Sequence, residues 1–146
     1  MDKQVLMTFL EHKPDKCKVM VVGDIMLDKY YYGEVTRISG EAPVPITRVQ
    51  QTSEKLGGGA NIAYNLAVLG CQTSISGFVG NDHHCESMVE KFHSCGIDDS
   101  SLVYTDRPTT AKVRVVSNNQ QMFRLDFEEV TPVEGVYADR FKDNIA

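Results

Sequence analysis

A run of glycines that leads directly into an apolar helix constrains this chain more than any other stretch. Gly57, Gly58 and Gly59 remove every Cβ where the chain turns, so that a ligand can approach the backbone closely. The next residues recur at helical spacing and predict a buried helix ending near Gly70: Ile62, Ala63, Leu66, Ala67 and Leu69. The start of such a helix attracts polar or anionic ligands, and the Asn61 amide in its first turn can both donate and accept. The simpler alternative is a tight turn that lets the helix pack on a sheet.

Two nucleotide-binding motifs are excluded by the residues after the glycines. A P-loop requires Gly-Lys-Ser/Thr, whereas Gly59 is followed by Ala60 and Asn61. A dinucleotide-binding fingerprint requires a third glycine, and Ile62 occupies that position. That fingerprint also follows a strand directly, whereas the polar residues 51–55 predict a turn.

Composition narrows the class of protein. The 146 residues suffice for one ordinary domain or part of a larger one, and 42% of them are hydrophobic, which is enough for a core. The net charge of −5 argues against nucleic acid as a main partner. No apolar run is long enough to span a membrane, and we expect neither a secretory signal nor a membrane partner.

The cysteines predict a reducing compartment rather than a metal site. None of Cys17, Cys71, Cys85 and Cys95 forms a C-x-x-C pair, so we expect reduced thiols and a cytoplasmic location. A metal site can be drawn from neighbouring His and Cys side chains, but their spacing matches no zinc pattern and we expect no metal ligands. These side chains are His83, His84, Cys85, His93 and Cys95.

Two carboxylates follow a predicted buried strand. Residues 18–22 form a continuous, β-branched run of the kind found in parallel sheets, and Asp24 and Asp28 come after it. The carboxyl ends of such strands face the ligand crevice, so both are candidate binding residues. Asp24 has an alternative role as the cap of the following turn. Asp28 is a charge in an apolar, aromatic stretch and therefore needs a partner or a function.

The order of the remaining elements predicts a parallel α/β unit interrupted by an inserted β-sheet. We expect short inserted strands at 29–35 and 44–49, with Tyr30 to Tyr32 as packing residues or a recognition stripe. A second apolar strand spans 71–80. A helix over 83–94 follows, with Asp82 as its N-cap and Gly96 at its end.

A β-hairpin is predicted near the end of the chain. Residues 109–117 alternate clearly, Asn118-Asn119 turns the chain, and 120–127 return. Lys112 and Arg114 then project from one face, where they either clamp a phosphate or form a solvated surface. We also expect a short strand at 101–104 and a helix at 137–145. No further parallel strand follows, so the pattern is typical of the front part of a bigger domain.

Four segments resemble the ribokinase-like (PfkB) carbohydrate kinases. The resemblance covers nearly all of residues 18–129 and extends, within the family, to the bacterial heptose 7-phosphate kinases of lipopolysaccharide-core synthesis. The segments that carry it are Val-Val-Gly-Asp-Ile-Met-Leu-Asp-Lys-Tyr at 21–30, Arg-Ile-Ser-Gly-Glu-Ala-Pro-Val-Pro at 37–45 together with Gly-Gly-Gly-Ala-Asn at 57–61, and Asn-Asn-Gln-Gln-Met-Phe-Arg-Leu-Asp-Phe-Glu-Glu at 118–129.

The resemblance implies a fold and a set of binding residues. It implies the N-terminal part of a ribokinase-like three-layer α/β sandwich with an inserted β-sheet lid. We expect residues 1–17 to be a leader and 18–146 an incomplete kinase domain, with lid strands at about 29–50 and 101–127. Asp28 matches the family's sugar-hydroxyl aspartate, and Gly58, Gly59 and Asn61 match its sugar-contacting motif.

The resemblance also implies a reaction whose chemical half is missing here. The family transfers the γ-phosphate of ATP, with Mg²⁺, to a sugar hydroxyl. Its base and anion hole belong to a Gly-Ala-Gly-Asp motif, which this sequence does not contain. We therefore expect no catalytic residue in this chain and no activity from it alone. The expected role is sugar-phosphate binding within a heptose 7-phosphate kinase, with a homodimer through the lid or a complementing C-terminal half as partner. The alternative is a non-catalytic sugar-phosphate-binding or lid dimerisation module that acts with a separate chain.

Overall fold

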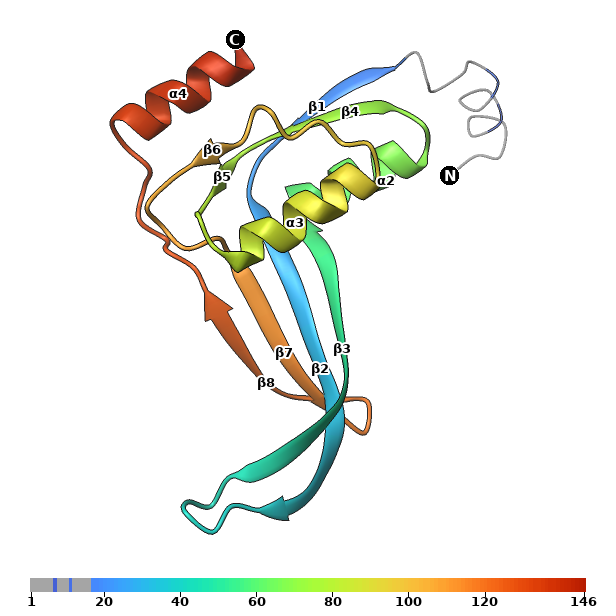
Figure 1. Ribbon diagram of the computed structural model, residues 1–146, viewed down its shortest axis with the longest axis vertical. Coiled ribbons are helices and arrows are strands. Elements are labelled where there is room, and N and C mark those ends of the chain that lie inside the picture. Colours follow the sequence, from blue (N-terminus) through green and yellow to red (C-terminus); the bar gives the residue numbers. More distant parts are fainter. Residues whose placement is uncertain (1–6, 8–10, 12–16) are drawn as a thin grey trace.

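The computed structural model describes Met7, Glu11 and residues 17–146. The predicted leader therefore lies outside the described residues, apart from Met7, Glu11 and Cys17. The described chain folds into an α/β body from which a four-stranded sheet projects (Figure 1).

The body consists of short parallel strands and the helices around them. These elements are β1 (Lys18–Val22), β4 (Gln72–Ser76), β5 (Phe78–Val79), β6 (Val103–Tyr104), α2 (Gly59–Val68), α3 (His83–Ser94) and α4 (Val136–Ile145). β1 pairs in parallel with β4, and β5 pairs in parallel with β6. The predicted apolar strand 71–80 is thus two strands, which separate at Gly77 and take different partners.

The hydrophobic core lies between the body strands, α2 and α3. α2 turns Ala60 and Ala63 inward, and α3 contributes Cys85, Met88 and Phe92. Small residues on α2 let it approach β1 and β4 closely, while Phe92 is completely buried. The predicted helix 83–94 is confirmed, including its cap, because the Asp82 carboxylate accepts from the backbone N–H groups of His84 and Cys85, each at 3.0 Å.

The projecting sheet, called the lid below, has the strand order β3-β2-β7-β8. Its strands are β2 (Ile25–Ile38), β3 (Pro45–Gly58), β7 (Ala111–Ser117) and β8 (Gln120–Phe127). β2 is antiparallel to β3 and parallel to β7, and β7 forms the predicted hairpin with β8. Asn118 and Asn119 have φ values of 50° and 61°, which are the left-handed values that a two-residue type I′ turn requires.

The lid differs from the sequence prediction in two respects. Residues 51–55, predicted to form a turn, lie within β3, and the first two inserted strands are 14 residues each. The polar stretch becomes a strand because each residue pairs across to β2, with Glu54 opposite Lys29 and Lys55 opposite Asp28. Residues 103–104 pair with β5 in the body, so they do not extend the lid.

Asp82 ties the start of α3 to the segment that leads into the lid. Besides capping α3, its Oδ2 accepts from the backbone N–H of Thr109 at 2.8 Å, just before β7. Burial by itself raises the pKa of this carboxyl, but the backbone N–H groups of Thr109, Cys85 and His84 outweigh it, and the net pKa is lowered. The ionised carboxylate therefore stabilises the fold.

We predict that Asp82→Ala lowers the free energy of unfolding by about 1–3 kcal/mol at pH 7, from the lost cap and the buried N–H left unpaired. Because the folded pKa is depressed, this contribution is present above the unfolded pKa of about 4 and is lost as pH falls below it. Urea unfolding at pH 7 and near pH 3.5 measures both effects. Asp139→Ala, which removes an exposed carboxylate paired with Lys142, is the control and changes stability by less than about 0.5 kcal/mol. Equal effects of the two substitutions would contradict the assignment.

Candidate functional site

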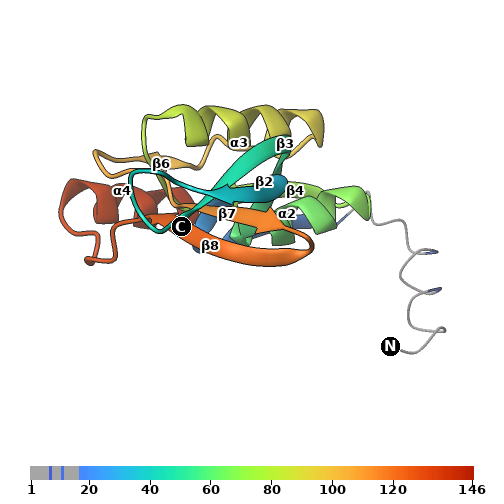
Figure 2. The same cartoon turned by 90° about the horizontal axis from the view of Figure 1, so that it is seen from below.

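Along β2 and β7, successive side chains point to opposite sides of the lid, which gives the lid two faces. Paired residues of neighbouring strands share a face, and the register places Asp28 beside Lys112 and Tyr30 beside Arg114. We call the face that carries these four residues the inner face. The outer face carries Glu54 and packs against α3, where the Ser87 hydroxyl donates to the Glu54 carboxylate at 2.9 Å. Figure 2 shows α3 along this side of the base of the lid.

Asp28, the charged residue that was predicted to need a partner or a function, pairs with Arg114. Arg114 Nη1 donates to Asp28 Oδ1 at 2.5 Å, and the two side chains are 19% and 22% exposed. The hydrogen bond to Asp28 raises the pKa of Arg114, while burial acts in the opposite direction. The guanidinium carbon of Arg114 lies 5.3 Å from the centre of the Tyr30 ring, and Lys55 Nζ lies 5.7 Å from that ring. Two predicted binding residues thus hold each other in place on the inner face.

An ion pair on the outer face, between Lys29 and Glu54, helps to hold the lid in position. Lys29 Nζ lies 2.8 Å from Glu54 Oε1, and both side chains are largely covered. Their hydrogen bond lowers the pKa of Glu54 and raises that of Lys29. Because Ser87 of α3 joins the same carboxylate, this ion pair fixes the lid against the body.

A pocket of about 570 Å³ lies where the inner face meets the body. Two predicted residues, Asp24 and Lys112, line it, and its size is in the range of small-molecule sites. The Lys112 ammonium lies 3.8 Å from Glu128, which also lines the pocket. Further polar lining comes from Thr105, Arg107, Thr110, Glu129 and Thr131.

The glycine run makes room first for the protein itself. A Cβ on Gly58 would lie 2.5 Å from the carbonyl oxygen of Asp24, and Gly58 has a φ of 55°. Gly59 donates its N–H to that same carbonyl at 2.7 Å. The Asp24 backbone therefore fixes the start of α2, so close packing is one role of these glycines.

Asn61 is placed apart from the other predicted residues. It lines a second hollow of about 440 Å³ with Lys55, Tyr64 and Lys91, beside the edge strand β3. None of the residues lining this hollow lines the pocket of Asp24 and Lys112. The structure thus brings Asp28 to Arg114 and Asp24 to Lys112, but places Asn61 in a different depression.

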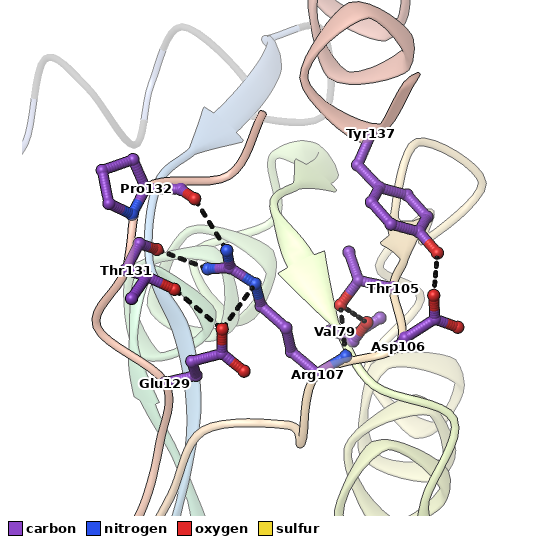
Figure 3. Close-up of polar contacts among 8 residues, drawn as sticks. All are labelled: Val79, Thr105, Asp106, Arg107, Glu129, Thr131, Pro132 and Tyr137. Atoms are coloured by element: carbon purple, nitrogen blue, oxygen red, sulfur yellow. Dashed lines mark hydrogen bonds and ion pairs between the residues drawn. The ribbon is translucent and has the colours of Figure 1, made fainter. Parts of the chain in front are cut away.

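Sequence reasoning missed Arg107, which holds the segment after β8 across the pocket wall. Figure 3 shows its guanidinium between the Glu129 carboxylate and the carbonyls of Thr131 and Pro132. It donates to these carbonyls at 2.5 and 2.7 Å and lies 3.5 Å from Glu129 Oε1. Beside it, the Tyr137 hydroxyl of α4 donates to Asp106 at 2.6 Å. Residues 105–108 lie outside any periodic pattern, so no local signal marked Arg107.

Among residues 17–146, no group of three or more His, Cys, Asp or Glu side chains is arranged to hold a metal ion. Within the same part of the chain, no helix combines the length and apolar character needed to cross a membrane.

Known sequences match most of the chain. The profile of the pfkB family carbohydrate kinase matches residues 16–132. The bifunctional protein HldE of Shewanella amazonensis is 47% identical over 115 residues, which are 79% of this chain and 24% of that protein. HldE of Shewanella loihica is 46% identical over 120 residues, which are 82% and 25% of the two chains. The chain therefore spans about a quarter of the length of these curated relatives.

Solved structures share the fold. A carbohydrate kinase from Agrobacterium tumefaciens superposes with a TM-score of 0.61 at 24% identity, over 75% of this chain and 35% of that one. Arabidopsis thaliana ribokinase, solved with ribose and ATP, gives a TM-score of 0.60 at 23% identity over the same shares. These likenesses confirm the predicted α/β fold, the N-terminal part of a ribokinase-like domain.

We predict that Gly57→Ala disturbs the Asp28–Arg114 pair. A Cβ at this position would lie 2.5 Å from Asp28 Oδ2 and 2.8 Å from Met26 Cγ, so one of these side chains must move. We expect a loss of about 1–3 kcal/mol in unfolding free energy, measured by urea denaturation, and a displaced Asp28 in a crystal structure of the variant. Gly40→Ala meets no atom within 4 Å and is the control. Similar stability of the two variants would show that the contact at Gly57 is relieved without cost.

Proposed function

Because the chain belongs to the pfkB family of carbohydrate kinases, we propose that it forms the acceptor-binding part of an ATP-dependent sugar-phosphate kinase. The proposed acceptor is heptose 7-phosphate, phosphorylated at C1 to a precursor of ADP-heptose and the lipopolysaccharide core, in the cytoplasm. The HldE relatives support a kinase of this type. The observation that carries the proposal is the Asp28 side chain, held on the inner face by Arg114 next to the pocket of Asp24 and Lys112.

Each inner-face residue has a role that suits a sugar phosphate. An ionised carboxylate accepts two hydroxyl donors, so Asp28 and Asp24 bind sugar hydroxyls. Lys112 and Arg114 now pair with Glu128 and Asp28, and an incoming phosphate offers them a second anionic partner. Gly58 and Gly59 complete the acceptor side from the start of α2, whereas Asn61, which lines the separate hollow, is not assigned a contact with the acceptor.

We propose that ATP and Mg²⁺ bind in a part of the kinase domain outside the segment that this chain shares with its relatives. The described residues offer no metal-binding cluster, and the sequence contains no Gly-Ala-Gly-Asp motif. The proposed contribution of this chain to phosphoryl transfer is therefore the positioning of the acceptor.

We further propose that two copies associate through the outer face of the lid. Phe123 and Leu125 of β8 lie on this face, opposite Val115 and Val113, and remain 47% and 48% exposed. Apolar side chains in a row on a free sheet face favour burial against a second copy.

The binding role is tested by Asp28→Asn, which keeps the shape of the side chain and removes its charge. A hydrogen bond to a charged group contributes about 1.5–3 kcal/mol, so affinity for heptose 7-phosphate falls about 10- to 100-fold while the fold is retained. This affinity is measured by calorimetric titration of a protein in which this chain is joined to the C-terminal remainder of a relative's kinase domain. Glu34→Gln, which removes a carboxylate paired with Arg48 in an exposed part of β2, is the control. Unchanged affinity of Asp28→Asn would show that Asp28 serves only the lid structure.

The dimer is tested by substitutions on the two faces of the lid. We expect light scattering to give twice the chain mass for the wild type and the single mass for the double variant Phe123→Ser with Leu125→Ser. Val116→Ser, an apolar position of β7 that pairs with Tyr32 on the inner face, leaves the dimer intact. A monomeric wild type, or equal dissociation by Val116→Ser, would contradict an interface on the outer face.

A further inference from the structure

Two of the four cysteines lie side by side at the start of the central parallel strands. β1 and β4 pair with Lys18 opposite Gln72, so the preceding residues, Cys17 and Cys71, are lateral neighbours. The backbone N–H of Gln72 donates to the carbonyl of Cys17 at 2.9 Å, which shows that the parallel pairing extends to this point. Neighbouring strands lie about 4.8 Å apart, which is inside the Cα–Cα range of about 4.4–6.8 Å that a disulfide spans.

The two side chains also point the same way. Residues two apart in a strand share a face. Cys17 is therefore on the face of Val19 and Val21, and Cys71 is on the face of Thr73 and Ile75. Both sets face the core side of the sheet, where Val21 and Ile75 are buried. The Cys17 and Cys71 side chains therefore lie on one face of two neighbouring strands. The other two cysteines lie elsewhere: the Cys95 thiol lies 3.5 Å from the Ser94 hydroxyl, and Cys85 is buried on α3.

The thiols differ in accessibility, which sets an order of reaction. Cys17 is exposed, whereas Cys71 is 7% exposed. Burial raises the pKa of the Cys71 thiol, with the neighbouring Cys17 as a smaller cause. An exposed thiolate reacts first with a dissolved oxidant, and a buried thiol reacts best with a sulfur already beside it.

We propose that Cys17 and Cys71 form a reversible redox site that takes a small-molecule disulfide, such as oxidised glutathione, as its oxidant. The Cys17 thiolate attacks one sulfur of the oxidant, forms a mixed disulfide and releases one thiolate. Cys71 loses its proton to solvent and attacks Cys17 Sγ, which releases the second thiolate. The balance is two protein thiols and one disulfide giving one protein disulfide and two small thiols. Such reversible intracellular disulfides are typical of redox sensing.

The position of the bond predicts its effect. It joins the amino-terminal ends of β1 and β4, whereas Asp24 and the inner face of the lid lie beyond the carboxyl end of β1. Oxidation therefore cross-links residues 17 and 71 within the body, and the bond lies away from the pocket. We expect a higher melting temperature, because the cross-link restricts the unfolded chain, and an unchanged pocket.

The test uses the intact 146-residue chain, reduced and then equilibrated with oxidised glutathione. We expect the wild type to lose two of its four thiols, and non-reducing peptide mass spectrometry to find Cys17 joined to Cys71. The melting temperature rises by about 5–10 °C and returns on addition of dithiothreitol. Cys17→Ser abolishes the cross-link and the shift. Cys71→Ala leaves a persistent glutathione adduct on Cys17.

Cys95→Ser and Cys85→Ser are the matched controls, and both retain the cross-link. A stable glutathione adduct on Cys17 of the wild type, with Cys71 still free, would overturn the proposal. A cross-link that includes Cys85 or Cys95 would overturn it as well, and so would a Cys17–Cys71 bond that leaves the melting temperature unchanged.

Discussion

The close approach of the glycine run to the backbone of Asp24 is the contact on which the rest of the structure depends. Gly58 and Gly59 meet the Asp24 carbonyl where β3 ends and α2 begins, and one hydrogen bond joins the lid, the helix and the end of β1. Side chains at these positions would push the three elements apart. The inner face of the lid would then no longer meet the body.

Charge decides how the lid uses its two faces. On the inner face Asp28 and Arg114 form a partly exposed ion pair. On the outer face Lys29, Glu54 and Ser87 join the lid to α3, while the apolar side chains farther out on β8 remain exposed. The same β2 strand therefore contributes alternate residues to the proposed binding face and to the support of the lid. A substitution on either face is expected to act on one property more than on the other.

Much of the fold could be predicted because its signals are local. Asp82 and Gly96 bound α3 through caps that one turn of helix determines, and Asn118 and Asn119 specify the hairpin because few residues adopt left-handed values. Residues 51–55 were predicted wrongly because a polar strand has no apolar alternation, and its pairing with β2 is non-local. Arg107 was missed for a similar reason, since its partners at 129, 131 and 132 follow two further strands.

The sequence by itself determined the element types, the glycine turn and the carboxylates at the end of a buried strand. These follow from backbone sterics and from the cost of leaving a charge such as Asp28 in apolar surroundings. Only the tertiary structure decided which groups meet: that Arg114 is the partner of Asp28, that Asn61 lines a separate hollow, and that Cys17 lies beside Cys71. The two residues of the Asp28–Arg114 pair, and those of the Cys17–Cys71 pair, are separated by tens of residues in the chain. Their contact depends on strand register, which the packing of whole sheets sets and no local pattern encodes.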